Sequence, residues 1–196
     1  MNIEPRRWIS STTSNDIETS LECDSHADTC CVGRLALIIR DFDRPVSVYG
    51  YDPSLGAKNY RTVSAVIGYT CPQSGRTFHL ILHQAIEIPD LEHHLLCPMQ
   101  CRVNDIVVND TPKFCTRAPT RETHAIIAPD PDGNSPLIMP LHIRRVTSYL
   151  PVHKPSLREW DSMSIPRIEL TSEHLDWDPA SNRYEEQEES MSEIAH

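Results

Sequence analysis

Short apolar runs, broken by turn residues, follow one another along the chain from about residue 20 to residue 152. Leu35–Ile39 is an apolar run bounded by charged residues, which predicts a buried strand. Residues 46–51 alternate between apolar and polar, residues 52–56 are rich in turn formers, and residues 60–63 again favour a strand. The pattern therefore predicts a hairpin with a long tip.

A second, more apolar hairpin is predicted directly after the first. Its strands are Val63–Tyr69 and Thr77–Ile88, and Cys71–Gly75 supplies the proline and glycine of a turn. Pro98–Asn104 predicts a short helix, Asp105–Asn109 a strand, and residues 136–152 one or two further strands. Residues 116–122 and 129–136 favour loops. This succession predicts a mainly β domain.

The two ends of the chain differ from this central part. The first residues are polar, and from residue 154 onward the apolar periodicity fades, although Ser164–Leu170 retains a weak tendency to pair. Residues 154–196 hold four basic and eleven acidic residues, a net charge of −7, as expected of a solvated segment. We therefore predict a flexible lead over 1–19, a folded domain over 20–152, and an acidic, largely disordered tail or linker over 153–196.

Composition narrows the possible partners and the compartment. The net charge is −10 and no basic stripe is present, which argues against direct nucleic-acid binding. No stretch reaches the ~18 apolar residues of a membrane span, and residues 1–20 lack the apolar core of a secretory signal. The chain has seven cysteines, an odd number that does not suggest a complete set of disulfides. We therefore expect reduced, mostly buried thiols. Together these features predict a cytoplasmic protein that does not bind membranes.

Candidate chemistry lies in the polar segment Asp24–Thr29, with the sequence DSHADT, which separates apolar stretches and runs into Cys30–Gly33. The segment predicts a turn after a strand, presenting a carboxylate followed by a hydroxyl. Taken alone it is equally typical of a polar turn or a helix cap, because Asp, Ser and Thr are common in both. A second segment, Ile88–Gln100, with the sequence IPDLEHHLLCPMQ, closes the same unit.

These two segments carry a resemblance to a known family. Asp24–Ala27 resembles the Asp-Ser/Thr-Gly-Ala loop of retroviral-type aspartic proteases, and residues 89–97 resemble the P-G-L-x-H-N-L-L-S segment of copia-type retrotransposon polyproteins. The resemblance covers roughly Glu22–Asp110, and its two anchors occur in the family's order. It implies a small closed barrel of the acid-protease (retropepsin-like) type with disordered termini.

The resemblance also implies an activity, that of an aspartic endopeptidase acting on a retroelement polyprotein. Two carboxylates that share a proton perform this hydrolysis with water as nucleophile and without a cofactor. A chain with one such loop supplies the second carboxylate by forming a homodimer. Asp24 would then be catalytic, Ser25 would bond across the two-fold axis, Ala27 would pack under the loops, and Asp28 would contact the peptide substrate's backbone.

The implied flap is the tip of the first hairpin. These flap residues are Gly50, Tyr51, Asp52, Pro53, Ser54, Leu55 and Gly56. Two positions depart from the family: His26 replaces the loop glycine, and Cys97 stands at a later glycine position where copia-type sequences often carry a small Ser. A residue with a Cβ at position 26 is strained if the site requires positive φ or close approach. A catalytically inactive, retroelement-derived dimerising or peptide-binding module is therefore the alternative function.

Other chemistries compete for the same cysteines and histidines. His93, His94, Cys97 and Cys101 place four possible zinc ligands within nine residues, although zinc sites usually join two such pairs across a longer loop. A cysteine nucleophile beside His26 lacks a readable supporting partner. Trp160 and Trp177 are interpreted as linear contact points or incidental residues of the tail.

Overall fold

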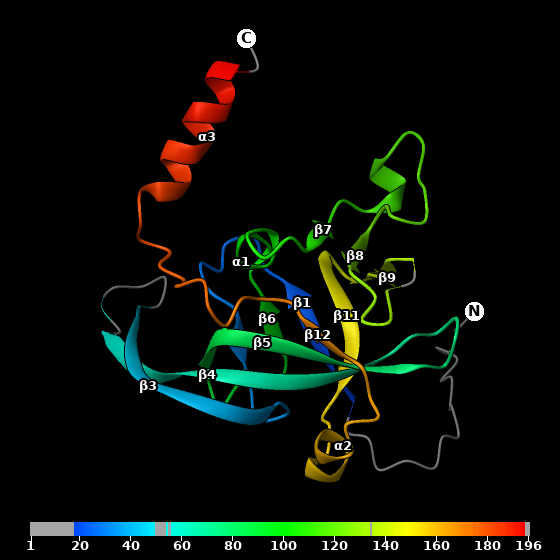
Figure 1. The fold of residues 1–196 in the computed structure, drawn as a ribbon. Coiled ribbons are helices and arrows are strands. Elements are labelled where there is room, and N and C mark those ends of the chain that lie inside the picture. Colours follow the sequence, from blue (N-terminus) through cyan, green and yellow to red (C-terminus); the bar gives the residue numbers. More distant parts are fainter. Residues whose placement is uncertain (1–17, 50–53, 55, 134, 195–196) are drawn as a thin grey trace, which may run out of the picture.

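The computed structural model describes residues 18–49, 54, 56–133 and 135–194. Within these residues the strands form a nine-stranded sheet, in the order β10-β11-β1-β6-β2-β5-β4-β3 with β12 beside β5, and a three-stranded sheet, β7-β8-β9 (Figure 1). The larger sheet contains β1 (Glu18–Cys23), β2 (Cys31–Val32), β3 (Leu37–Tyr49), β4 (Ala57–Thr70), β5 (Thr77–Glu87), β6 (His94–Leu96), β10 (His142–Arg144), β11 (Thr147–His153) and β12 (Arg167–Glu169). The smaller sheet contains β7 (Val107–Asn109), β8 (Ala125–Ala128) and β9 (Leu137–Pro140). The helices are α1 (Pro98–Arg102), the 3₁₀ turn η2 (Lys113–Cys115), α2 (Leu157–Asp161) and α3 (Arg183–Ile194).

Both predicted hairpins are present; β3 and β4 are longer than predicted, and β5 ends one residue before the predicted Ile88. β3 pairs with β4 from Leu37 opposite Val66 to Tyr49 opposite Ala57. The register shifts between Asp41 and Pro45, where Asp43 takes a positive φ and its N–H bonds the Asp41 carboxylate. The two strands predicted over 35–39 and 46–51 are thus one strand bent by a bulge, because a local irregularity interrupts the apolar alternation without ending the pairing.

The centre of the larger sheet is β5. It pairs with β4 along one edge, and with β12 and then β2 along the other. Its residues from Phe78 to Ile86 are all buried, as expected of a strand with neighbours on both edges and cover on both faces. The core also includes Leu21 of β1, Leu96 of β6 and Leu150 of β11, each completely buried.

The predicted short helix and later strands are also present. α1 begins with a proline at its first turn and is capped by the Cys97 side chain, which accepts from the N–H of Gln100. The predicted strand over 105–109 is β7, and residues 136–152 form β9, β10 and β11. β8 was not predicted, since its four residues offer too short an apolar run.

The prediction of a largely disordered tail from residue 153 is wrong for the part that follows β11. Residues 167–169 form β12 in parallel register with residues 79–81 of β5. Ile168, Leu170, Thr171 and Trp177 are buried. Sequence patterns did not reveal this packing, because the apolar side chains of this segment occur singly between polar ones, without a period. They become buried only in the folded chain, mainly against an edge and a face of β5. The chain then leaves the body as α3 (Figure 1).

The fold class is confirmed as mainly β, while a regular closed barrel is not observed. One residue pair, His153 with Gly68, links β11 to β4, but the strands do not lie evenly round a common axis. At the N-terminal end, β1 already begins at Glu18, and residues 1–17 of the predicted lead lie outside the described residues. No helix in the described ranges is long and apolar enough to cross a membrane.

Candidate active site

The two segments singled out in the sequence lie against each other. β1 and β6 run in parallel, with Leu21 opposite His94 and Cys23 opposite Leu96. Backbone N–H groups of the first segment then bond the second: Asp24 N–H donates to the Leu96 carbonyl (3.0 Å), Cys30 N–H to Gln100 Oε1 (2.8 Å), and Gly33 N–H to His94 Nδ1 (3.1 Å). In return, Cys97 N–H donates to Cys30 Sγ (3.2 Å). The loop from residue 24 to residue 33 is therefore held from beneath by residues 94–100.

Asp24 begins this loop at the end of β1, with a partly exposed side chain. Its Oδ1 accepts a hydrogen bond from the His26 N–H (2.9 Å), and its carbonyl accepts one from the Ala27 N–H (3.2 Å). Such an Asx turn is a standard use of aspartate in loops. Here it orients the carboxylate of a side chain that stays partly exposed.

His26 fits its position without backbone strain. The described non-glycine residues with positive φ are Asp43, Gln84, Asp105, His124, Arg145 and Met163. His26 is not among them, so its Cβ carries no penalty from a left-handed conformation. Its imidazole is exposed, and Nδ1 lies 3.4 Å from the Ser25 hydroxyl. Within one chain, a glycine at position 26 is therefore not required for this turn.

The second half of the loop is held by a residue from the C-terminal segment. The Trp177 indole N–H donates to the Asp28 carbonyl (3.0 Å) and lies 3.2 Å from the Thr29 hydroxyl. Trp177 is buried, and its backbone N–H donates to Gln84 Oε1 (3.0 Å). The Asp28 side chain is exposed and Ala27 partly buried. Interpreting Trp177 as an incidental residue is therefore wrong: it positions the loop.

Two buried glutamines connect the loop to the central strand. Gln84 donates through Nε2 to the carbonyls of Ser172 and Leu175, at 3.0 and 2.7 Å. Gln100 accepts from Cys30, as described above, and its Nε2 lies 3.4 Å from the carbonyls of His83 and Gln84. Buried amides of this kind specify one arrangement, because each lost partner leaves a costly unsatisfied group. Sequence reasoning missed both glutamines, and no local pattern marks them.

Gly33 packs tightly against two residues of the second segment, His94 and Leu91. His94 is completely buried, and burial, with a smaller contribution from His93, lowers the pKa of its imidazole to about 4. The ring is therefore neutral at pH 7, with Nδ1 accepting from Gly33. A Cβ added at Gly33 would lie 1.9 Å from the Leu91 carbonyl oxygen. Only glycine permits this approach.

The cysteines around the loop are poor nucleophiles. Burial raises the pKa of the Cys30 thiol well above its usual range, and raises those of Cys23 and Cys31 to about 12 and that of Cys97 to about 11. The thiolate is the reactive form, so these groups are inert at neutral pH. All seven cysteines are free thiols.

The residues considered as zinc ligands are engaged in other contacts. His94 bonds Gly33, Cys97 caps α1, and His93 Nε2 lies 3.5 Å from a Glu22 carboxylate oxygen. Cys101 is a free thiol, completely buried in the core as Cys30 is. Across the described ranges, no three His, Cys, Asp or Glu side chains are grouped so as to hold a metal ion. The structure therefore does not bring these four residues together as a metal site.

The predicted flap is described only in part. Gly50, Tyr51, Asp52, Pro53 and Leu55 lie outside the described residues. Ser54 is exposed, and Gly56 has a φ of +69°, which suits a turn at the tip of the β3–β4 hairpin. Arg61 on β4 pairs with Asp41 and Glu87 across three neighbouring strands, which braces the base of this hairpin.

Comparisons with known proteins add no family to these observations. No protein-family model matches the chain. No curated protein and no solved structure is significantly similar to it.

Proposed function

We propose that this chain is an aspartic endopeptidase of the retroelement type, acting as a homodimer on a polyprotein, with one Asp24 from each chain. The observation that carries the proposal is the locking of the 24–33 loop onto residues 94–100. The fold brings together the two segments that resemble the family. It also leaves Asp24 partly exposed, with its carboxylate oriented by the His26 N–H.

The chemistry requires two carboxylates at short separation. Their mutual repulsion raises one pKa, so that one Asp24 carries a proton while the other is ionised. Water attacks the peptide carbonyl carbon while the ionised carboxylate takes a proton from that water, and the protonated carboxyl group donates its proton to the carbonyl oxygen. No cofactor takes part. The pair would titrate with two apparent pKa values that belong to the dimer.

The remaining loop and hairpin residues take the roles that follow from this arrangement. Ser25 is exposed beside Asp24 and would bond across the two-fold axis. Ala27 would pack beneath the paired loops, and Asp28 would bond the substrate backbone. The β3–β4 hairpin with residues 50–56 would cover the substrate. The acid-protease barrel is the architecture we propose for each chain of the dimer. Free thiols throughout the chain suit a reducing, cytoplasmic compartment.

The test is cleavage of unstructured peptides at mildly acidic pH by the purified chain. Asp24→Asn should abolish cleavage, because an amide cannot share or transfer the proton, while the unfolding midpoint changes little. Asp161→Asn is the matched control, since Asp161 is exposed on α2, on the opposite side of the body from the loop (Figure 1), and it should cleave normally. Cleavage that survives Asp24→Asn, or that resists an aspartic-protease inhibitor, would refute the proposal.

A second function is favoured by one observation, the exposed imidazole of His26 at the front of the loop. If two such rings crowd the two-fold axis, the chain is a catalytically inactive dimerising or peptide-binding module. His26→Gly separates the two functions. The enzyme would cleave with or without this change, whereas the module would bind peptide without cleaving it and would gain cleavage only as the glycine variant.

A further inference from the structure

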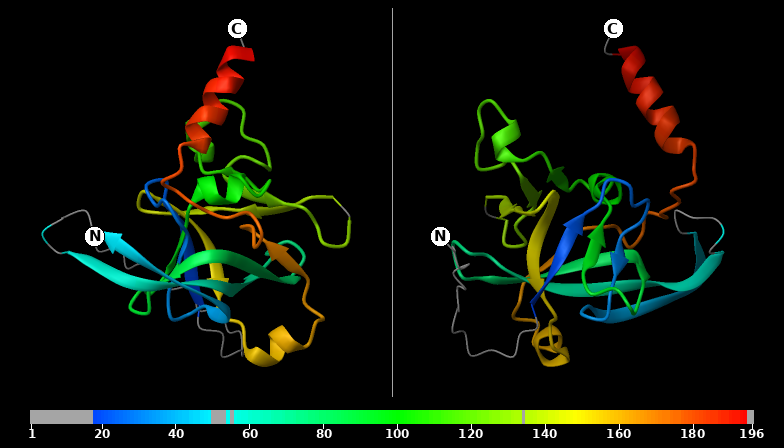
Figure 2. Two further views of the ribbon diagram at one scale, coloured as in Figure 1. Left: turned by 60° about the vertical axis from the view of Figure 1, so that its left-hand side comes forward. Right: turned by 180° about the vertical axis from the view of Figure 1, so that it is seen from behind.

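Two segments of opposite charge extend from the same side of the body (Figures 1 and 2). One is the acidic arm, residues 183–194, which forms α3; the other is the basic arm, residues 112–121, which contains η2. α1 lies between them in Figure 1. The charged residues are Glu185, Glu186, Glu188 and Glu189 on the acidic arm, and Lys113, Arg117 and Arg121 on the basic arm.

These charges have no partners of opposite sign. All seven side chains are exposed, and none takes part in an ion pair among the described residues. On α3, Glu185 faces Glu188 and Glu189 at helical spacings of three and four, where like charges destabilise a helix. An isolated helix of about twelve residues is marginal in water even without such repulsion. A cationic partner would therefore stabilise the helix of the acidic arm by offsetting this repulsion.

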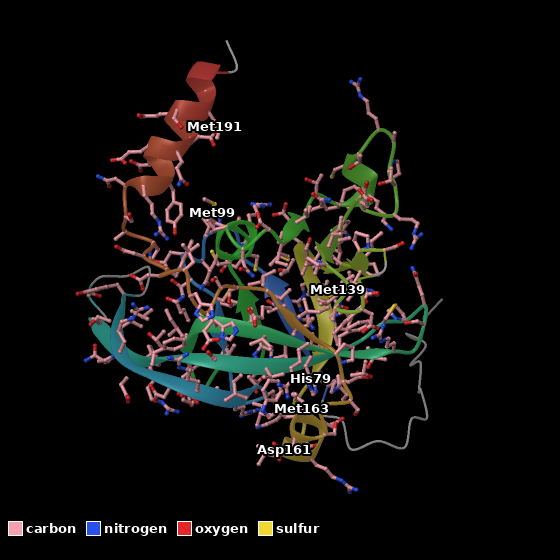
Figure 3. The ribbon with its side chains drawn as sticks, viewed as in Figure 1. His79, Met99, Met139, Asp161, Met163 and Met191 are labelled. Carbon is pink, nitrogen blue, oxygen red and sulfur yellow. The ribbon has the colours of Figure 1, made fainter. Side chains whose placement is uncertain are left out.

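A groove beside the acidic arm offers a place for an apolar side chain. It has a volume of about 740 Å³ and lies between α1 and α3, lined by Met99, Tyr184 and the carboxylate face of the helix. Met99 is 45% exposed, and Figure 3 shows it on α1 near the start of α3. The basic arm carries a matching group, because Phe114 is 81% exposed and lies between Lys113 and Arg117 in the sequence.

We propose that the acidic arm of one chain binds the basic arm of a second copy, with Phe114 in the groove beside Met99. Because both arms extend from one side, a two-fold axis across that side places each helix against the other chain's basic arm, which makes a closed, self-complementary interface. Charge complementarity favours this partner over an unrelated one. This inference rests on the homodimer of the proposed function.

The same arrangement bears on the candidate active site. The loop between β1 and β2 lies beside α1 on the side from which the arms extend (Figure 1), and the Cys30–Gln100 hydrogen bond ties it to that helix. Copies joined through their arms therefore bring their Asp24 loops toward each other. The arms would supply the association that the shared site requires.

A charge exchange tests this interface on the full chain in the Asp24→Asn background, which prevents self-cleavage. One variant changes Glu185, Glu186, Glu188 and Glu189 to Lys; the other changes Lys113, Arg117 and Arg121 to Glu. Each variant alone opposes like charges and should dimerise about 100-fold more weakly than the parent chain. An equimolar mixture of the two opposes unlike charges again and should form a one-to-one dimer, measured by sedimentation velocity.

Single substitutions provide matched controls. Arg117→Glu and Phe114→Ala should each weaken the dimer about tenfold, since the first reverses one charge of the interface and the second removes its aromatic anchor. Arg158→Glu makes the same charge change on α2, which lies on the opposite side of the body (Figure 1), and should leave dimerisation unchanged. These exposed positions carry the test if a multiple variant fails to fold, which circular dichroism would show.

Several results would overturn the interface. They are a parent chain that stays monomeric, variants that dimerise as the parent does, single changes without effect, and a mixture that fails to associate. Cleavage assays on the same chains with Asp24 restored separate this inference from the proposed function. Dimers that depend on the arms but never cleave would retain the interface and refute the protease, whereas cleavage by an undisturbed dimer of the basic-arm variant would do the opposite.

Discussion

His94 makes the fold sensitive to acid, and replacing it with asparagine should remove much of that sensitivity. The imidazole is completely buried, its Nδ1 accepts from Gly33, and its Nε2 has no hydrogen-bond partner within the described part of the chain. Burial disfavours the charged form, so the pKa of His94 falls to about 4 in the folded chain, against about 6.5 when unfolded. The fold thus accommodates the neutral ring only.

The size of the effect follows from proton linkage. Above about pH 6.5 the ring is neutral in both states, and below about pH 4 it is protonated in both. Between these limits only the unfolded chain binds the proton, so the free energy of unfolding declines as the pH falls. The contribution of His94 amounts to about 3 kcal/mol across the whole interval. Burial also lowers the pKa values of His79, His83 and His124, which adds to the decline.

Two variants separate titration from packing. His94→Asn keeps an acceptor for the Gly33 N–H but does not titrate; it should lose about 1 kcal/mol near pH 7.5 through the smaller side chain. Its decline between about pH 7.5 and pH 4.5 should be about 2.5 kcal/mol smaller than that of the wild type. His94→Leu also does not titrate, but it leaves the Gly33 N–H without an acceptor and should cost about 1–3 kcal/mol at every pH.

The assay is urea unfolding at several pH values, with the unfolding free energies compared between the variants and the wild type. The difference between the wild-type and His94→Asn curves isolates the titration of His94 from that of the other histidines. A His94→Asn curve parallel to that of the wild type, within about 0.5 kcal/mol, would refute the reasoning. The proposed protease works at mildly acidic pH, so this decline would limit its useful range from below.

Two further substitutions test the contacts that hold the loop. Gly33→Ala should destabilise the fold by about 3 kcal/mol or more, because the obstacle is the Leu91 backbone, while the control Gly75→Ala, with open space around it, should cost only about 1 kcal/mol for its positive φ; equal losses in urea unfolding would contradict this. Trp177→Phe removes the indole N–H from the Asp28 carbonyl and should cost about 1–3 kcal/mol, whereas unfolding indistinguishable from the wild type would show that the bond is dispensable.

The elements that sequence predicted well are those with local causes. The two hairpins follow from alternation and turn residues, and α1 follows from Pro98 at its first turn. One error has a local cause and the other a tertiary cause. The bulge at Asp43 divided one strand into two in the pattern, and the isolated apolar residues near Ile168 gave no period. Such residues become core only when β5 presents an edge and a face to them.

The candidate site divides in the same way. Its loop was singled out by the resemblance of Asp24–Ala27 and of the later second segment to two motifs of one family, in the family's order. Its supports could not be found so, because they act across the chain: Trp177 reaches Asp28 from 149 residues away, and Gln100 reaches Cys30 from 70. Their residue types carry no distinctive pattern, and an amide or an indole becomes part of a site only through burial beside a backbone group.

The sequence by itself therefore determined the mainly β class, the two hairpins and the loop that begins with Asp24, since alternation, turn chemistry and motif order are properties of neighbouring residues. The tertiary structure alone decided how that loop is held, how the segment after β11 packs, and on which side the two charged arms emerge. Those features depend on which backbone groups are buried together, and burial is a property of the folded chain as a whole.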